Sequence, residues 1–202
     1  MSMSSKRKGI PMPDVFDVLS HDHEEVKQML AELETGPTAM TGATGEQLQA
    51  RKKLAEKLII EESKHEAVEE EYFWPAVREK LPEGNRLADE ATQQEQDAKV
   101  VLDRIDKLGA SEPEFEELIS KFALAGREHI AYEETQVWPA MQAALSHHEA
   151  AELGEKLESG KPMAPTRPHP NTPPKPGILK SAGPAVAAAD KARDAMTGRG
   201  KE

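Results

Sequence analysis

The sequence of 202 residues contains no cysteine. This absence excludes disulfide bonds, zinc–thiolate sites, iron–sulfur clusters and thiol catalysis, and it leaves oxygen and imidazole groups as the available metal ligands. No stretch is long and apolar enough to span a bilayer, and the N-terminus lacks the apolar run of a signal peptide. We therefore expect a cytoplasmic protein that has no membrane partner.

Aromatic residues are scarce, at 4% of the chain, whereas charged residues make up 31%. Apolar residues recur with the period of an amphipathic helix, and short connections between such helices favour antiparallel packing. Pro75 is expected to kink or shorten the second helix. The sequence predicts an all-α, up-down-up-down four-helix bundle over residues 14–159, with helices at 14–34, 46–80, 86–108 and 113–146 and a helical extension at 147–159.

Basic residues are too few to balance the acidic ones, and the net charge is −11. Residues 161–202 carry eight Lys or Arg and three Asp or Glu, a charge of +5, which leaves −16 on residues 1–160. An acidic body of this size repels nucleic acid and tolerates cations. We expect residues 1–13 to be a flexible leader and the Pro-, Ala- and Lys-rich residues 160–202 to be a disordered basic tail.

One sequence pattern occurs twice, as HEAVEEEYFWPA at 65–76 and as HIAYEETQVWPA at 129–140. In each copy a histidine precedes a glutamate by four residues, so that His65 with Glu69 and His129 with Glu133 share one helix face. Such a pair supplies half of a metal site. We expect the fold to bring the two halves together.

The predicted core becomes polar at the same level of all four helices. Buried carboxylates need a compensating charge, and no lysine or arginine occupies the matching inward positions. Two cations about 3.5–4 Å apart would neutralise the cluster, and this mixture of ligands suits iron better than manganese or zinc. The predicted metal ligands are His23, His65, Glu69, Glu95, His129 and Glu133, with Gln94 as the alternative to Glu95 on the third helix.

The remaining residues near the motifs receive other roles. The Glu-x-x-His pattern of ferritin-like bundles fits Glu62 and His65 but fails at the second copy, where Gly126 stands three residues before His129. Glu62 is instead a possible acid that orients His65. We expect Glu70 and Glu134 to be solvated, and the tryptophans of the two Trp-Pro pairs to fill space at the end of the bundle.

With these residues in place, the sequence resembles the hemerythrin-like, HHE-type cation-binding family. The resemblance covers about residues 14–147 and rests on DVFDVLSHDHEEVKQML together with the two repeated motifs. It implies a four-helix bundle with a non-haem centre of two irons per chain, joined by an oxo or hydroxo bridge. It also implies that Glu69 and Glu133 bridge the irons and that the three histidines are terminal ligands.

The third helix departs from the family pattern, because no histidine occurs between residues 66 and 128 and Glu95 stands at the equivalent place. An anionic ligand favours ferric iron, which argues against reversible O₂ carriage. We expect a di-iron protein that reacts with O₂, NO or hydrogen peroxide in sensing, buffering or detoxification. The alternatives are an enzyme with catalase-like activity alone, iron storage or delivery, and a metal-free interaction module that binds through its tail.

Overall fold

The computed structural model describes residues 13–172, 177 and 181–200. Every regular element in these ranges is a helix, which confirms the predicted all-α class. None of the helices in the described ranges has the length and apolar character needed to cross a bilayer. The elements are α1 Val15–Thr35, η1 Ala39–Thr41, α2 Gly45–Val68, η2 Glu69–Phe73, α3 Trp74–Lys80, α4 Gly84–Lys107, α5 Pro113–Tyr132, η3 Glu133–Val137, α6 Trp138–Ala144, α7 His147–Gly160, η4 Lys161–Met163 and α9 Gly183–Thr197.

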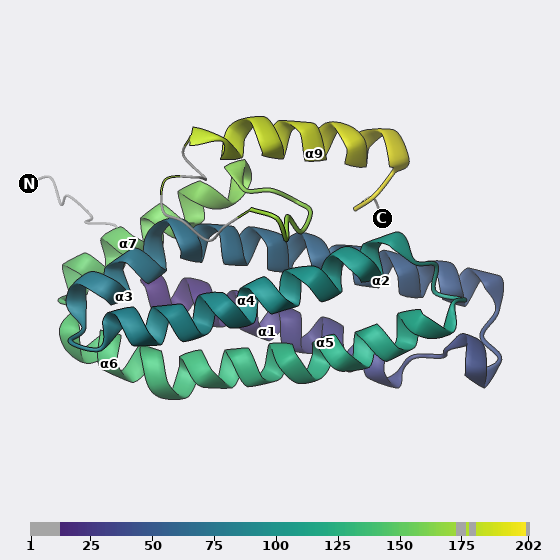
Figure 1. Ribbon diagram of the computed structural model, residues 1–202, viewed down its shortest axis with the longest axis horizontal. Coiled ribbons are helices and arrows are strands. Elements are labelled where there is room, and N and C mark those ends of the chain that lie inside the picture. The colour runs from purple at the N-terminus through teal and green to yellow at the C-terminus, as the bar shows by residue number, and fades with distance from the viewer. Residues whose placement is uncertain (1–12, 173–176, 178–180, 201–202) are drawn as a thin grey trace, which may run out of the picture.

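Four long helices, α1, α2, α4 and α5, lie side by side along the long axis of the molecule (Figure 1). Helix α1 contacts α2 and α5, and α4 contacts the same two helices, so the four surround a common interior. Side-chain caps fix where several helices begin: Asp14 accepts hydrogen bonds at the start of α1, and Thr44 does so at the start of α2. The observed helices lie close to the predicted ones.

The two Trp-Pro pairs share an unusual backbone. A proline inside a helix lacks an N–H, and its ring clashes with the carbonyl four residues earlier. Here a single π-helical turn precedes each Trp-Pro pair, and the N–H of Trp74 bonds to the carbonyl of Glu69 as that of Trp138 does to Glu133. The helix therefore continues through Pro75 to Lys80 and does not end there. Wide turns of this kind often occur at functional sites.

The predicted helical extension is a separate helix. The chain leaves α6 at Leu145, and Ser146 caps the start of α7 with a hydrogen bond from the N–H of Glu149. Helix α7 packs against α1 through the buried Leu153 and Leu157. Gly154 permits this approach, because a Cβ there would lie 2.7 Å from the backbone of Asp14.

The apolar interior is divided into two clusters. One contains Phe16, Trp74, Trp138 and Leu157, and the other contains Leu30, Leu58, Ile105 and Phe122. On α1, α2 and α4 a predicted metal ligand separates the residues of the first cluster from those of the second, and on α5 the change of cluster falls between His129 and Glu133. The polar layer therefore lies between the clusters, and its carboxylates Glu69, Glu95 and Glu133 are buried.

The described part of the basic tail is folded against the bundle. Helix α9 lies along its outside (Figure 1), and Arg167 and Arg199 lie 2.9 and 3.0 Å from the carboxylate of Asp106 on α4. The predicted disorder of residues 160–202 is thus not confirmed where the tail is described. The predicted leader lies outside the described residues except for Pro13.

Candidate metal centre

The structure brings all six predicted side chains together in the buried layer. The Nε2 atom of His23 lies 3.0 Å from one oxygen of Glu133, and the Nε2 atom of His129 lies 3.3 Å from the other. The Nε2 atom of His65 lies 3.1 Å from an oxygen of Glu69. Both glutamates are fully buried. The two repeated motifs therefore face each other across the interior.

Several polar atoms in this layer lie close to one another without forming hydrogen bonds. Both oxygens of Glu69 and of Glu133 lack a hydrogen-bond partner, as do the Nε2 atoms of His23 and His129. Buried polar atoms are nearly always hydrogen-bonded, and unpaired carboxylates are costly in an apolar interior. The unpaired atoms are gathered within a few ångströms of one another, which is the arrangement that a bound cation satisfies.

The side chains form two adjoining groups, each compact enough for one ion. His23, His65 and Glu133 form one group, and Glu69, Glu95, His129 and Glu133 form the other. Within each group the ligand atoms all lie within 4.8 Å of one another. Glu133 belongs to both. A carboxylate shared by two neighbouring positions fits a pair of metal ions better than it fits a single one.

Each histidine is oriented by a second contact at Nδ1. The acceptors are Glu134 for His23 at 3.1 Å, Asp22 for His65 at 3.2 Å and Gln94 for His129 at 2.9 Å. An oxygen acceptor at Nδ1 requires the ring proton there, which leaves the lone pair of Nε2 free to bind a metal.

These contacts correct two predictions from the sequence. Glu134 was expected in solvent but contacts His23 and lies 2.9 Å from Lys27. Glu62 was expected to orient His65, yet Asp22 makes that contact. Asp22 directly precedes His23 on α1, so the sequence places a carboxylate next to a predicted ligand. The sequence does not show that the Asp22 side chain extends from the surface of α1 to α2.

The third helix contributes both candidate residues, in different roles. Glu95 enters the second metal group, whereas Gln94 accepts from His129. The indole Nε1 of Trp74 donates to one oxygen of Glu95 at 2.5 Å, and the other oxygen has no partner. Trp74 therefore positions a candidate ligand and does more than fill space. Trp138, in the second copy, stacks on His23 with ring centroids 4.9 Å apart.

The ionisation of the ion-free centre reflects its burial. Burial and repulsion by Glu133 raise the pKa of Glu69, and burial and repulsion by Glu69 raise that of Glu95 well above its usual value. Burial opposes a charged imidazole, but the Glu133 carboxylate outweighs it and raises the pKa of His129 to about 9. Protons thus take the place of cations when the centre holds no ion.

A buried lysine lies beside the centre, contrary to the expectation that inward positions carry none. Lys99 contacts Glu70 directly and lies 3.9 Å from Glu66. Glu70 is therefore not simply solvated. No described lysine or arginine lies within ion-pairing distance of Glu69, Glu95 or Glu133, so the central negative charge is left for another cation.

Two known proteins resemble this chain. A curated relative, an uncharacterized hemerythrin-like protein of Schizosaccharomyces pombe, is 28% identical over 141 residues, covering 69% of this chain and 70% of the relative. A solved structure of a hemerythrin HHE cation binding domain-containing protein from Mycobacterium kansasii, a homolog of Rv2633c, has the same fold. Its TM-score is 0.62 at 21% identity, with 89% of this chain and 99% of that one covered.

The family comparison covers the part of the chain that holds the centre. The family of the hemerythrin HHE cation binding domain matches residues 14–141, more than half of the chain. That range includes both copies of the repeated motif as well as His23 and Glu95. The chain therefore belongs to the hemerythrin HHE cation-binding family, as the sequence resemblance predicted.

Proposed function

We propose that the protein holds two iron ions between its two His-x-x-x-Glu motifs and uses this centre to react with O₂, NO or hydrogen peroxide. His23, His65, Glu69, Glu95, His129 and Glu133 are the ligands in this proposal, and the antiparallel bundle of residues 14–159 is the unit that carries them. Bound iron supplies redox chemistry and an electrophilic position for a small oxygen-containing molecule.

The convergence of unpaired atoms carries this proposal. Four carboxylate oxygens and two imidazole nitrogens are buried without hydrogen bonds around the same small space. Mixed imidazole and carboxylate ligands suit iron, and the absence of cysteine removes the ligands that a structural zinc site prefers. Manganese and zinc are the less favoured alternatives.

The environment of Glu95 favours peroxide chemistry over reversible O₂ carriage. Glu95 is anionic when it binds a metal, and the hydrogen bond from Trp74 holds it in place. A carboxylate in place of an imidazole stabilises the ferric state, which needs no external reductant to meet peroxide. We therefore favour peroxide detoxification over the sensing of O₂ or NO, and we favour both over the storage or delivery of iron.

Metal analysis combined with activity measurements tests the proposal. The protein is loaded with ferrous iron without oxygen, freed of excess metal and then exposed to hydrogen peroxide in an oxygen electrode. We expect steady oxygen evolution from the wild type and none from the variant His129→Ala. A reversible absorption band with O₂, without oxygen evolution from peroxide, would assign the centre to O₂ binding and overturn the order given above.

A further inference from the structure

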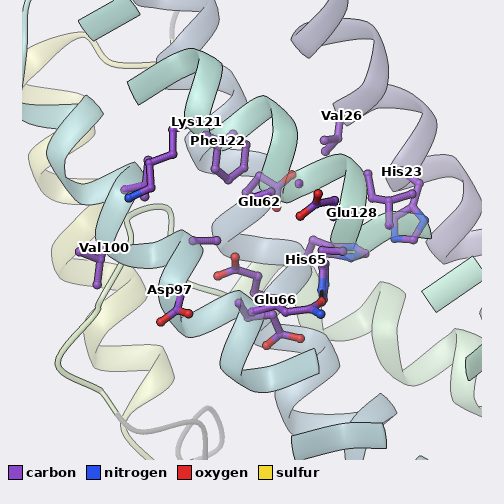
Figure 2. A pocket seen from close by; sticks show the side chains of 18 residues that line it. His23, Val26, Glu62, His65, Glu66, Asp97, Val100, Lys121, Phe122 and Glu128 are labelled. Carbon is purple, nitrogen blue, oxygen red and sulfur yellow. Dashed lines mark hydrogen bonds between the residues drawn. The ribbon is translucent and has the colours of Figure 1, made fainter. Parts of the chain in front are cut away.

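A cavity of about 420 Å³ adjoins the metal centre and opens between α4 and α5. His65, His129 and Glu95 form part of its inner wall, while Asp97, Val100 and Lys121 belong to its exposed side. Figure 2 shows Lys121 and Val100 on one side of this space, His23 and His65 on the other, and Glu62 and Glu66 between them. The cavity therefore leads from the surface to the proposed ions.

The volume of the cavity is far greater than a diatomic gas or peroxide requires. One water molecule needs roughly 10–15 Å³ of such space, and pockets for small organic ligands start at about 300 Å³. Interiors of folded proteins are otherwise packed with few voids larger than water. A space of this size beside the centre therefore requires its own explanation.

Small residues keep the space open. Ala98, Ala125 and Gly126 line it, and Gly126 lies in the middle of α5. A glycine inside a helix costs roughly 0.5–1 kcal/mol relative to alanine. No close approach of another helix's backbone demands it, because the atoms nearest to a Cβ at Gly126 would belong to the side chains of Phe122 and Leu30, at 3.7 and 3.8 Å. Its effect on the structure is to leave room.

The repeated motifs make the cavity asymmetric. Glu62 and Gly126 stand three residues before His65 and His129, and both line the space. One copy thus supplies a buried carboxyl group, and the other supplies an opening. Glu66, one turn after Glu62, lies on the same face of α2.

The carboxyl groups on this wall lack sufficient positive partners. One oxygen of Glu66, a residue that is 3% exposed, has no hydrogen bond. Its nearest described cation, Lys99, lies 3.9 Å away and makes a closer contact with Glu70. No described lysine or arginine pairs with Glu62. The inner wall also has apolar members, among them Phe122, whose ring suits contact with an apolar or cationic group.

We propose that this cavity binds a small organic molecule that carries an ammonium group on an apolar body. The ammonium group donates hydrogen bonds to Glu62 and Glu66, and the body packs against the walls supplied by Val26, Val101 and Phe122. The acidic wall, with Asp97 and Glu128 against the single Lys121 at the opening, selects against carboxylates of the same size. Only the position of this molecule beside iron rests on the proposed function, because the binding groups belong to the protein.

Three probes of one shape test the proposal: benzylamine, benzyl alcohol and benzoate. Each is titrated by calorimetry at fixed pH into the ion-free protein and into the iron-loaded protein. We expect benzylamine to bind both forms most tightly and Glu62→Gln to weaken it about tenfold, as expected for losing one hydrogen bond to a charged group. Equal or tighter binding of benzoate to the ion-free protein, or no binding of benzylamine, overturns the proposal.

Variants at Gly126 locate the binding. Gly126→Leu fills the space and should abolish benzylamine binding, whereas the matched control Gly126→Ala adds one methyl group and should preserve it. Ala125→Leu, at an exposed position on the opening, should also weaken binding without disturbing the core. Unchanged binding in both leucine variants overturns the assignment to this cavity. A protein that binds benzylamine but no iron refutes the proposed function and leaves this inference standing.

Discussion

The ammonium group of Lys161 lies 2.7 Å from one oxygen of Asp22, whose other oxygen lies 3.2 Å from Nδ1 of His65. Lys161 follows α7 at the start of the predicted tail and lies outside the range matched by the family. The tail segment is therefore joined to a candidate ligand through one carboxylate. The contact with Lys161 holds the Asp22 carboxylate in place, and the carboxylate in turn fixes the direction of the Nε2 lone pair of His65.

The variant Lys161→Met tests this connection. Loss of groups that orient metal-binding histidines costs roughly 10–100-fold in metal affinity, and because Lys161 acts through Asp22 we expect about the lower limit. The measurement is a competition of the protein against a chelator for ferrous iron. The exposed Lys156 on α7 supplies the control, and Lys156→Met should leave the affinity unchanged.

Glu95→His tests whether the third helix sets the redox preference of the centre. Replacing an anionic ligand by a neutral one destabilises the ferric state, so we expect a higher reduction potential and a longer-lived O₂ adduct. Redox titration followed by optical spectroscopy measures both. If neither property changes, Glu95 does not bind the metal.

The two tryptophans of the repeated motif form a matched pair for a stability measurement. Trp74 donates to buried Glu95, whereas Nε1 of Trp138 has no partner. Both changes to phenylalanine remove similar volume, but Trp74→Phe also leaves a buried oxygen unsatisfied, at a cost of about 1–3 kcal/mol. In urea unfolding of the ion-free protein, the free energy of unfolding of Trp74→Phe should be lower than that of Trp138→Phe by this amount. Equal losses in the two variants would contradict the role given to Trp74.

The docking of α9 on the tail segment that contains Thr166 and Arg167 should depend on pH through Asp194. This carboxylate accepts from Thr166 at 2.6 Å and from Arg167 at 2.7 Å. Burial alone would raise its pKa, but the hydrogen bond from Thr166 and the charges of Arg199 and Arg167 outweigh burial and lower it from 3.8. Because docking lowers the pKa of Asp194, the ionised carboxylate stabilises the docked state at pH values above the ordinary pKa of an aspartate. This stabilisation is lost as the pH falls through the lowered pKa of Asp194.

Hydrogen exchange of α9 measures that docking. Protection should be present at neutral pH and decrease below about pH 3.8, the ordinary pKa of an aspartate. Asp194→Asn should reduce it already at pH 7, while the neighbouring exposed Arg193→Gln should not. Full exchange of α9 in the wild type at pH 7 would instead restore the prediction of a disordered tail.

The sequence predicted the polar layer well, because it depends on local spacing. A histidine and a glutamate four residues apart share a helix face in any packing, and the motif occurs twice, so the approach of Glu69 to Glu133 followed from the bundle. The contacts around this layer depend on long side chains that cross between helices. Asp22 and Lys99 occupy positions whose burial is decided by the neighbouring helix, which spacing within one helix does not reveal.

The π-helical turns were likewise beyond the sequence pattern. A proline at position 75 predicts that a helix hydrogen bond is missing, but not whether the backbone bends, ends or widens. The structure widens both turns, which directs Trp74 towards Glu95 and Trp138 towards His23. The cavity was also not apparent, since an alanine and a glycine on α5 indicate close packing as readily as open space.

Glu133 belongs to both candidate ion positions, and its substitution therefore tests the central claim most directly. The measurement is the iron content per chain after anaerobic loading and removal of excess metal, for the wild type and for Glu133→Ala. We expect about two irons per chain in the wild type, as a paired site requires, and loss of both in the variant. A wild type that retains no iron, and that melts at the same temperature with and without a chelator, would contradict the account.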